Sequence, residues 1–379
     1  MKIVHITTSL ELGGSERALE RLICADPENE HRVICLHEDG IVGPRLRDKG
    51  IRVDAIHLPR RRVPAPQAIA RLWHLIRTDR ADVVQAWMYH SNLLSALVGK
   101  AAGARTICWN IRRSGFHEDT LPASTKAVAR LGAWLSHFIP DAIIYCAYSA
   151  AKWHVEFGYD PDRVVVIQNG IDTETFAPSP SARQAVRTEL GITSSDLLIG
   201  SVARFHADKD HLTLFAALNQ VTTVYPELKC LLVGTGTEAD GQLAALAEKY
   251  GVAKHVILLG PRADLPAVMN ALDLHVTSSV TEGFPNVIAE AMACGTLCVA
   301  TDVGDARLVI GDHGWIVPIK SPVLLGDAIA KALALRGTPK WASLCESARA
   351  YCKSQFDIGK MVDAYREVWS SSAWRGRKS

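Results

Sequence analysis

One short stretch, residues 281–295 (TEGFPNVIAEAMACG), combines two carboxylates with the start of a predicted helix. Pro285 suits a first helical turn, and Gly295 can adopt the left-handed conformation that ends a helix. The free N–H groups of that first turn attract an anion such as a phosphate. Glu282 precedes the turn and Glu290 lies between one and two turns in. The stretch therefore predicts either a site for a ligand rich in hydroxyl groups or a capped helix with solvated acids.

Two cations follow another predicted strand, at 197–202. Arg204 follows the end of this strand at 202–203, and Lys209 lies five residues further on. Two cations at one strand end, opposite a helix N-terminus, could clamp a diphosphate. The alternative is a pair of solvated surface charges.

The first half of the chain has candidates of its own at predicted strand ends. Gly13 and Gly14 open the first predicted helix, where paired glycines allow a ligand to approach the backbone closely or simply make a tight turn. His90 lies past a strand end and could act as a base or donor, or be a satisfied buried histidine. Arg112 and Arg113 follow the next strand and could meet an anionic group.

Further arginines make the first half locally basic. They predict either a solvated face or a surface that contacts anionic lipid. These arginines are Arg60, Arg61, Arg62, Arg71, Arg77 and Arg80.

Two familiar patterns are interpreted as structural. Residues 234–239 match G-x-G-x-x-A after a strand, but the next strand, at 256–259, runs into Gly260-Pro261-Arg262 and not into an acid that could bind a ribose. A nicotinamide site is therefore not expected. The two D-x-D strings, 160–162 and 208–210, lie in a turn or enclose a lysine, so no metal site is predicted.

Composition limits the class of protein. The chain has 379 residues, 48% hydrophobic and 22% charged, with a formal net charge of +2, which favours neither nucleic acid nor an acidic partner. Its nine cysteines are scattered and form no C-x-x-C pair, which predicts reduced thiols and a cytosolic chain. No apolar run resembles a signal peptide or approaches the ~20 residues of a spanning helix.

Apolar strands alternate with amphipathic helices along nearly the whole chain. This order predicts an α/β fold of two doubly wound, Rossmann-like parallel sheets, with ligands bound in a cleft at their carboxyl edges. We expect an N-terminal domain of residues 1–172 completed by a C-terminal crossing helix within 356–379, and a second domain of residues 173–355.

Assembled in order, these motifs make the chain resemble the family-four glycosyltransferases, a retaining group with the GT-B fold. The resemblance spans nearly the whole length. It is carried by the turn at 13–16, VIQNGIDTETFAP (166–178), SVARFHADKD (201–210), LLVGTGTE (231–238), the run at 258–279 and EGFPNVIAEAMACG (282–295).

The resemblance implies a nucleoside-diphosphate sugar donor held mostly by the second domain. Arg204 and Lys209 would bind the diphosphate, Glu290 the ribose, Glu282 the donor sugar, and the backbone around Arg262 the base. The residues around sugar and phosphate would be Gly283, Phe284, Pro285, Asn286 and Val287, and Gly13 and Gly14 would lie under the donor phosphates.

The first domain departs from the family pattern. Family members often carry histidine at the ends of the fourth and fifth strands, where this chain has Trp87 and Asn110. His90, three residues beyond Trp87, is the histidine assigned in their place. With Glu282, Arg204 and Lys209 it completes the predicted catalytic set.

The expected activity is retaining transfer of a hexosyl or N-acetylhexosaminyl group from an NDP-sugar, with UDP as the expected nucleotide. The acceptor hydroxyl would belong to a saccharide, or to a lipid-linked saccharide at the cytoplasmic face of the membrane in surface-polysaccharide synthesis. No metal or other cofactor is expected, because Arg, Lys and helix amides would stabilise the leaving diphosphate. Alternatives are a nucleotide-sugar epimerase on the same fold and a non-catalytic sugar-nucleotide-binding module.

Overall fold

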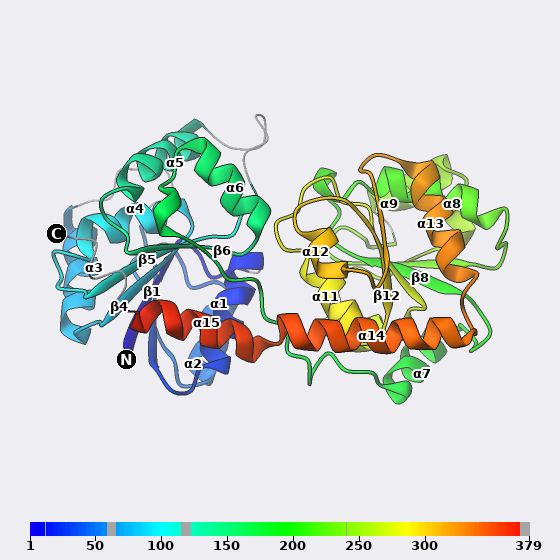
Figure 1. The fold of residues 1–379 in the computed structure, drawn as a ribbon, viewed down its shortest axis with the longest axis horizontal. Coiled ribbons are helices and arrows are strands. Elements are labelled where there is room, and N and C mark those ends of the chain that lie inside the picture. Colours follow the sequence, from blue (N-terminus) through cyan, green and yellow to red (C-terminus); the bar gives the residue numbers. More distant parts are fainter. Residues whose placement is uncertain (12, 59–65, 115–122, 240, 372–379) are drawn as a thin grey trace. The chain divides into compact units, whose positions relative to one another are not determined.

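The computed structural model describes the whole chain except residues 12, 59–65, 115–122, 240 and 372–379. The described chain forms two compact units (Figure 1). Unit 1 comprises Met1–Gly170 and the C-terminal residues from Ile358 onward, and unit 2 comprises Ile171–Asp357. The predicted arginines Arg60, Arg61 and Arg62 lie outside the described residues.

Unit 1 is built on a sheet whose strands are all parallel in the described chain. The strands are short apolar runs, and burial on both faces explains their continuous hydrophobicity. Across the sheet they are β3 (Arg52–Ala55), β2 (Glu30–Cys35), β1 (Lys2–Thr7), β4 (Val83–Trp87), β5 (Thr106–Ile111), β6 (Ala142–Tyr145) and β7 (Val164–Val166).

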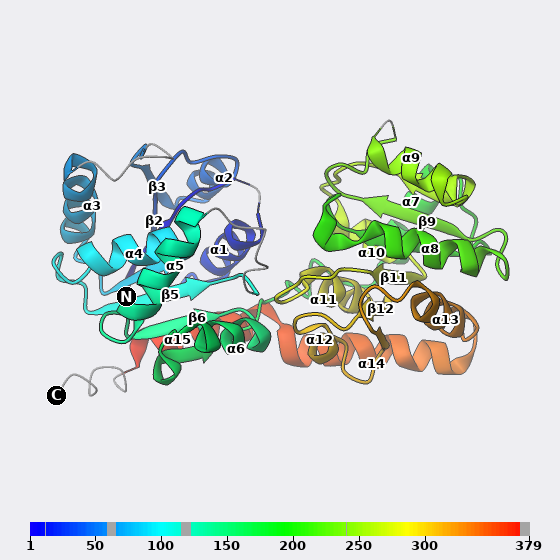
Figure 2. The same ribbon diagram turned by 90° about the horizontal axis from the view of Figure 1, so that it is seen from above.

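Helices cover both faces of this sheet (Figures 1 and 2). They are α1 (Gly14–Ala25), α2 (Val42–Asp48), α3 (Pro66–Asp79), α4 (Tyr89–Val98), α5 (Ala123–Ser136), α6 (Tyr148–Phe157) and the last helix, α15 (Ile358–Ser370). In Figure 1, α4, α5 and α6 lie on one face, and α1, α2 and α15 on the other.

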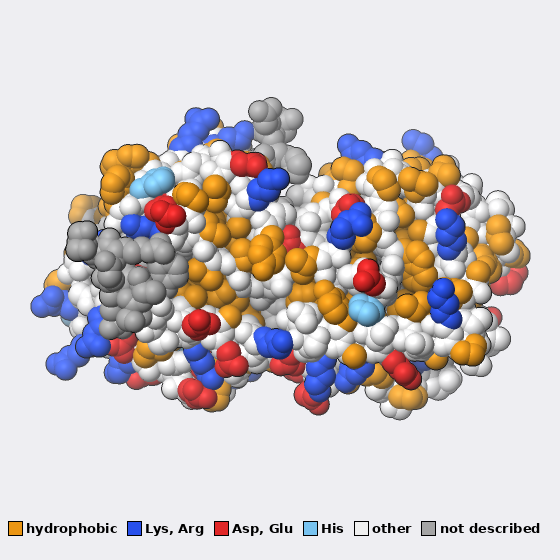
Figure 3. Space-filling model, viewed as in Figure 1, with side chains coloured by type: hydrophobic (Ala, Val, Ile, Leu, Met, Phe, Trp, Pro, Cys, Tyr) orange, Lys and Arg blue, Asp and Glu red, His pale blue; other side chains and the backbone are white. Residues whose placement is uncertain are grey.

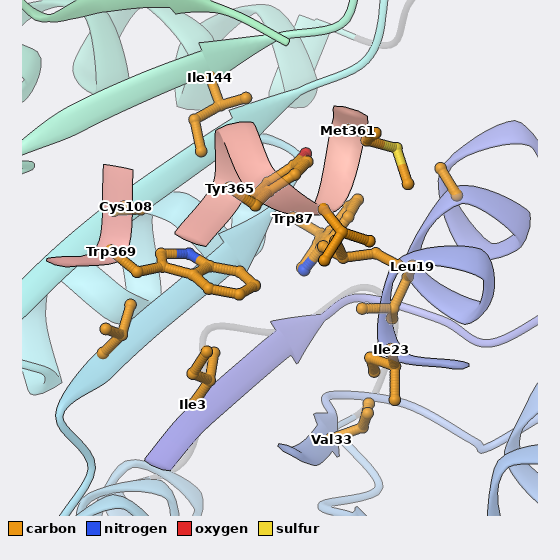
Figure 4. Packing of buried hydrophobic residues seen from close by; sticks show 14 of the residues in the cluster. Ile3, Leu19, Ile23, Val33, Trp87, Cys108, Ile144, Met361, Tyr365 and Trp369 are labelled. Carbon is orange, nitrogen blue, oxygen red and sulfur yellow. The ribbon is translucent and has the colours of Figure 1, made fainter. Parts of the chain in front are cut away.

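Helix α15 completes the core of unit 1 (Figure 4). Tyr365 and Trp369 are buried against Trp87 and other residues of the sheet. The Trp369 indole donates to Gln85 at 3.0 Å. The last helix is therefore part of the packing of unit 1, although it follows all of unit 2 in the sequence.

A directed chain of buried hydrogen bonds also links α15 to the sheet. Trp87 Nε1 donates to His5 Nδ1 at 3.2 Å, so His5 carries its proton on Nε2 and donates to His31 Nδ1 at 2.9 Å. His31 Nε2 then donates to Asp26 at 3.2 Å. Arg366 of α15 binds the same carboxylate at 2.6 Å. Desolvation lowers the pKa of His5 and His31, in keeping with two neutral rings.

Unit 2 has a second sheet that is all parallel within the described residues. Its strands, in spatial order, are β10 (Val256–Leu258), β9 (Lys229–Val233), β8 (Leu198–Val202), β11 (Leu274–Thr277), β12 (Leu297–Thr301) and β13 (Trp315–Val317). Its helices are α7 (Pro180–Glu189), α8 (His211–Thr222), α9 (Gln242–Lys249), α10 (Leu265–Ala271), α11 (Asn286–Ala293), α12 (Ala306–Ile310), α13 (Pro322–Leu333) and α14 (Pro339–Phe356).

The two-sheet α/β architecture expected from the sequence is confirmed, but several helices were not predicted. These are α2, α6, α7 and α12, each of ten residues or fewer. A helix this short shows only two or three turns of its period, so its sequence pattern is weak. In α2 the internal Pro44 further obscures the helical pattern.

Each sheet has a point at which the strand order reverses. In unit 1 this switch point lies between β1 and β4, and in unit 2 between β8 and β11. The loops that leave the carboxyl ends of such a strand pair turn to opposite faces, and ligands of open α/β sheets bind where they part. A functional site is therefore expected at these two edges.

Candidate active site

In unit 2 an ion pair bridges the switch point. Lys209 ends the short 3-10 turn Ala207–Lys209 after β8, and Glu282 follows β11. The Lys209 ammonium pairs with Glu282 Oε1, and the Ser279 hydroxyl donates to the same oxygen at 2.7 Å. The side chains are 22% and 13% exposed, so the pair is largely buried but still reached by solvent. Two predicted site residues thus meet in the structure.

The loops that carry this pair are fastened to each other. Ser278 Oγ donates to the Lys209 carbonyl at 2.8 Å, and the Val280 N–H donates to the Asp208 carbonyl at 2.8 Å. These bonds hold Lys209 and Glu282 in register without using their charged groups. Ser278 and Ser279 were missed by sequence reasoning, although a serine pair directly after a buried strand is a usable signal.

Arg204 is a second cation in the loop after β8, five residues before Lys209. It lies just past β8 and is exposed, and no residue in the described chain forms an ion pair or hydrogen bond with its guanidinium. Its loop packs on the glycine loop after β9, where a Cβ on Gly234 would lie 2.3 Å from the Ala203 carbonyl oxygen. The Phe205 N–H donates to Thr235 at 2.7 Å. The glycines of the G-x-G string therefore allow this loop to pack closely on the loop after β8.

Helix α11 begins directly after the acidic loop. Pro285 was predicted in the first turn; it is instead the N-cap, because Asn286 is the first residue with helical geometry. Gly295 has the expected left-handed φ of +77°. Phe284 is buried and packs edge-on against Phe356 at 5.4 Å between ring centroids. The first turn of α11, with Asn286 and Val287, therefore follows Glu282 within a few residues of the chain.

A neighbouring loop supports the backbone at Glu282. A Cβ on Gly304, whose φ is +58°, would lie 2.5 Å from the carbonyl oxygens of Glu282 and Gly283. The Asp305 N–H donates to the Gly283 carbonyl at 2.9 Å. This close approach requires glycine at 304, a position that the sequence analysis did not single out.

Glu290 has a different environment from Glu282. It lies in the second turn of α11 and is 3% exposed. Burial, with Glu290 nearby, raises the pKa of the Cys294 thiol to about 12. The two acids of the opening motif thus differ in position: Glu282 lies in a loop where solvent still reaches it, and Glu290 is buried in the helix.

Arg262 is held by two carboxylates. Its guanidinium binds Asp264 at 2.7 and 2.8 Å and Glu189 Oε2 at 3.1 Å. The hydrogen bonds that it donates to these two carboxylates raise its pKa above the usual value. The side chain is therefore committed to protein partners, and its backbone is the part left for a ligand.

In unit 1 the predicted glycines and histidine flank the other switch point. Gly13 is the N-cap of α1, and a Cβ on Gly14 would meet nothing within 4 Å, so this backbone is open. His90 lies in the first turn of α4 and is exposed. Desolvation, with His37 nearby, lowers the pKa of His90 and favours the neutral ring. Thr8 and Ser91 bridge the two loops at 3.1 Å.

Trp87 and Asn110 do not reach the surface. They are paired in register on β4 and β5, with exposed fractions of 1% and 0%. Tyr365 of α15 accepts a hydrogen bond from the Asn110 amide and stacks on Trp87 at 6.4 Å. The positions at which the family often has histidine are core positions in this chain.

Arg112 lies beside them with one unused donor. Its guanidinium sits over the Trp87 ring at 5.6 Å, and Nη1 donates to Tyr365 at 3.4 Å. Nη2 is buried with no hydrogen-bond partner in the described chain. An unpaired buried donor is costly, which makes Arg112 a candidate for contact with an anionic ligand.

Among the described residues, no three His, Cys, Asp or Glu side chains are grouped so as to hold a metal ion. Across the described parts of the chain, no helix is both long and apolar enough to cross a membrane.

Two family models match successive parts of the sequence. Residues 12–175 match Glycosyltransferase Family 4, and residues 196–334 match Glycosyl transferases group 1. An Escherichia coli relative, UDP-Gal:alpha-D-GlcNAc-diphosphoundecaprenol alpha-1,3-galactosyltransferase, is 23% identical over 312 residues, which are 80% of this chain and 79% of the relative. The D-inositol 3-phosphate glycosyltransferase of Segniliparus rotundus is 34% identical over 47% of this chain and 41% of its own.

Solved structures share the fold over nearly the whole chain. Anabaena HepE in complex with UDP superposes with a TM-score of 0.86 at 24% identity, covering 98% of this chain and 100% of HepE. WaaG, a glycosyltransferase involved in lipopolysaccharide biosynthesis, superposes with a TM-score of 0.73 at 16% identity, covering 98% and 100%. At these identities the likeness is one of fold.

Proposed function

Because this chain belongs to the GT-B glycosyltransferases of family four, we propose that it moves a hexosyl or N-acetylhexosaminyl group from a nucleoside-diphosphate sugar to an acceptor hydroxyl, with retention. The observation that carries the proposal is the Lys209–Glu282 pair at the switch point of unit 2, next to the start of α11. UDP is the proposed nucleotide, since HepE binds UDP and UDP-glucose and the E. coli relative is named for UDP-galactose.

The ion pair suggests how the donor would be received. A bound diphosphate would form ion pairs with Lys209, in place of Glu282, and with the exposed Arg204. The first-turn N–H groups of α11 would donate further hydrogen bonds to it. Glu282, released from Lys209, would accept hydrogen bonds from sugar hydroxyls. Lys209 would thus exchange one charged partner for another, and Glu282 would exchange its ion pair for hydrogen bonds from neutral hydroxyls, so neither group is left without a partner in this largely buried place.

The chemical step would use the same groups. The acceptor oxygen attacks the anomeric carbon on the face from which the diphosphate departs, and the bond from that carbon to the phosphate oxygen breaks. The acceptor proton passes to a phosphate oxygen of the leaving group. Lys209 and Arg204 stabilise the charge that develops there, so we propose that no metal is required.

Unit 1 would supply the acceptor side. We propose a lipid-linked saccharide as acceptor, supported by the diphosphoundecaprenol named for the E. coli relative. Gly13, Gly14 and His90 lie at the switch point of unit 1, where the neutral imidazole of His90 could accept a hydrogen bond from a sugar hydroxyl. The protein would act at the inner face of the membrane.

The proposal is tested by product analysis with UDP-sugars and a polyprenyl-diphosphate saccharide. We expect the wild-type chain to form a new glycoside, and Lys209→Ala to lower kcat/KM by at least about a hundredfold, the scale of losing one transition-state donor. The control is Lys353→Ala, because Lys353 forms an exposed ion pair with Glu174 in the same unit. Conversion of the donor sugar without an acceptor product would indicate an epimerase, and binding without turnover a sugar-nucleotide-binding module.

A further inference from the structure

A strained residue marks the carboxyl end of β4 in unit 1. Met88, the N-cap of α4, has a φ of +69° and a ψ of 166°, a backbone conformation that is found almost only in glycine. In this conformation its N–H donates to the Asn110 carbonyl at 2.8 Å, and its thioether accepts the Arg112 N–H at 3.5 Å. Such strain persists where the surrounding structure imposes it, and it is concentrated at ligand sites. The loops after β4 and β5 are thus fastened together at Arg112.

The guanidinium of Arg112 is held in place but largely unpaired. It lies over the Trp87 ring at 5.6 Å, and Nη1 donates to the Tyr365 hydroxyl at 3.4 Å. Trp87 and Tyr365 stack on each other in the core of unit 1 (Figure 4). A guanidinium carries five N–H groups, and within the described chain only this one has a hydrogen-bond partner. Because the group is already positioned, it would lose little side-chain entropy on binding an anion.

Arg112 also lies at the edge of the sheet where a ligand is expected. It follows β5, the neighbour of β4, and the switch point of unit 1 lies between β4 and β1. A general field of positive charge is not what would attract an anion to unit 1. The formal net charge is only +2, and Figure 3 shows basic and acidic side chains interspersed on the visible face of this unit. Recognition of an anion at this edge would therefore depend on a specific group, which Arg112 supplies.

We propose that Arg112 is a specificity-determining residue that binds a phosphate group of the acceptor, so that the acceptor is a saccharide phosphate or diphosphate and not a neutral glycoside. Two parallel N–H groups of a guanidinium match two oxygens of a phosphate. A bound phosphate would also offset the cost of the buried, unpaired Nη2. The phosphate could belong to a free sugar phosphate or to a lipid-linked saccharide. The inference rests on the proposed function only in assigning the phosphate to the acceptor.

Binding to the full chain tests the phosphate contact directly. Saturating UDP is present, so that the donor site does not contribute to the binding of the probes. The probes are farnesyl-diphosphate N-acetylglucosamine, N-acetylglucosamine 1-phosphate and methyl N-acetylglucosaminide. We expect at least one phosphorylated probe to bind at least about tenfold more tightly than the methyl glycoside, the scale of a charged hydrogen bond. Tighter binding of the farnesyl compound would indicate a lipid-linked source, and equal binding of the two phosphorylated probes a free sugar phosphate.

Substitutions at Arg112 separate charge from packing. Arg112→Met keeps a long side chain over Trp87 but removes the guanidinium. It should abolish the preference for phosphorylated probes, leave UDP-sugar binding unchanged, and raise the acceptor KM more than it lowers kcat. Arg112→Lys keeps the charge without the paired N–H groups and should retain part of the preference. The matched control is Arg105→Met, at the amino end of the same strand, where the side chain is 74% exposed. This control should bind all probes as the wild type does.

A purely structural role of Arg112 predicts a different result. Arg112→Met would then lower the urea midpoint of unfolding and weaken all three probes alike, which would overturn the proposal. Wild-type chain that binds neither phosphorylated probe more tightly than the methyl glycoside would also overturn it, as would a loss of UDP-sugar affinity in Arg112→Met. Equal glycoside formation on neutral and phosphorylated acceptors contradicts only the role of Arg112. Phosphate binding that depends on Arg112, without any glycoside product, contradicts only the proposed transfer.

Discussion

At the residue scale, the two acids of one motif have separate physical settings. Glu282 lies in a loop still reached by solvent, where it already has a cationic partner and a serine donor. Glu290 is buried in the second turn of α11. This difference supports the proposal that Glu282 contacts the sugar and Glu290 the ribose.

The role of Glu290 can be tested by donor binding. Glu290→Gln keeps the shape of the side chain but removes its charge, and it should weaken UDP-sugar binding at least about tenfold, the scale of a charged hydrogen bond. Calorimetry measures the Kd, and circular dichroism checks that the variant is folded. Glu248→Gln, on the exposed face of α9, is the control. Unchanged affinity in Glu290→Gln would remove the proposed ribose contact.

At the element scale, α15 stabilises a sheet from which it is distant in sequence. The Asn110–Tyr365 contact joins residues 255 positions apart. This helix fills the space beside Trp87 and so decides that Trp87 and Asn110 are core residues. A change on α15 should therefore act on the stability of unit 1.

This dependence predicts a large effect at Trp369. Trp369→Ala should lower the free energy of unfolding of unit 1 by about 3–5 kcal/mol, since the side chain is 1% exposed and its removal leaves a cavity. Urea titration followed by circular dichroism measures the loss. Trp134→Ala, a change at a tryptophan that is 62% exposed, should cost little. Equal stability of the two variants would show that α15 does not contribute to the core as described.

At the scale of the whole molecule, each unit contains a buried histidine held neutral. His154 in unit 1 accepts from Tyr89 at 2.8 Å, and His275 in unit 2 accepts from the Val202 N–H at 3.4 Å. Burial lowers the pKa of each to about 4 from 6.5. In the unfolded chain both would take up protons below about pH 6.5.

Stability should consequently fall in mild acid. Because the unfolded state binds more protons than the folded state between pH 6.5 and 4, the free energy of unfolding decreases as pH drops through that window, by up to about 3 kcal/mol per histidine. Urea titrations at several pH values measure the slope. His275→Asn should reduce it, whereas His74→Gln, at an exposed position, should not. A slope unchanged by His275→Asn would contradict this cause.

Local patterns in the sequence were enough to predict most of the secondary structure and the fold class of this protein. Hydrophobic period and length identified the strands, the two sheets and α11, because these signals depend on neighbours within a few residues. The glycine with φ of +77° after α11 was predicted for the same reason. The order of motifs along the chain identified the family.

Only the tertiary structure decided which of these residues meet. Lys209 and Glu282 are 73 positions apart and pair because β8 and β11 are neighbours in the sheet, a fact of strand order that no local pattern encodes. Likewise Trp87, which stands where the family often has histidine, is a core residue because α15 covers it. Strand order and helix docking arise from burial of apolar surface between distant segments, so they appear only when the whole chain is packed.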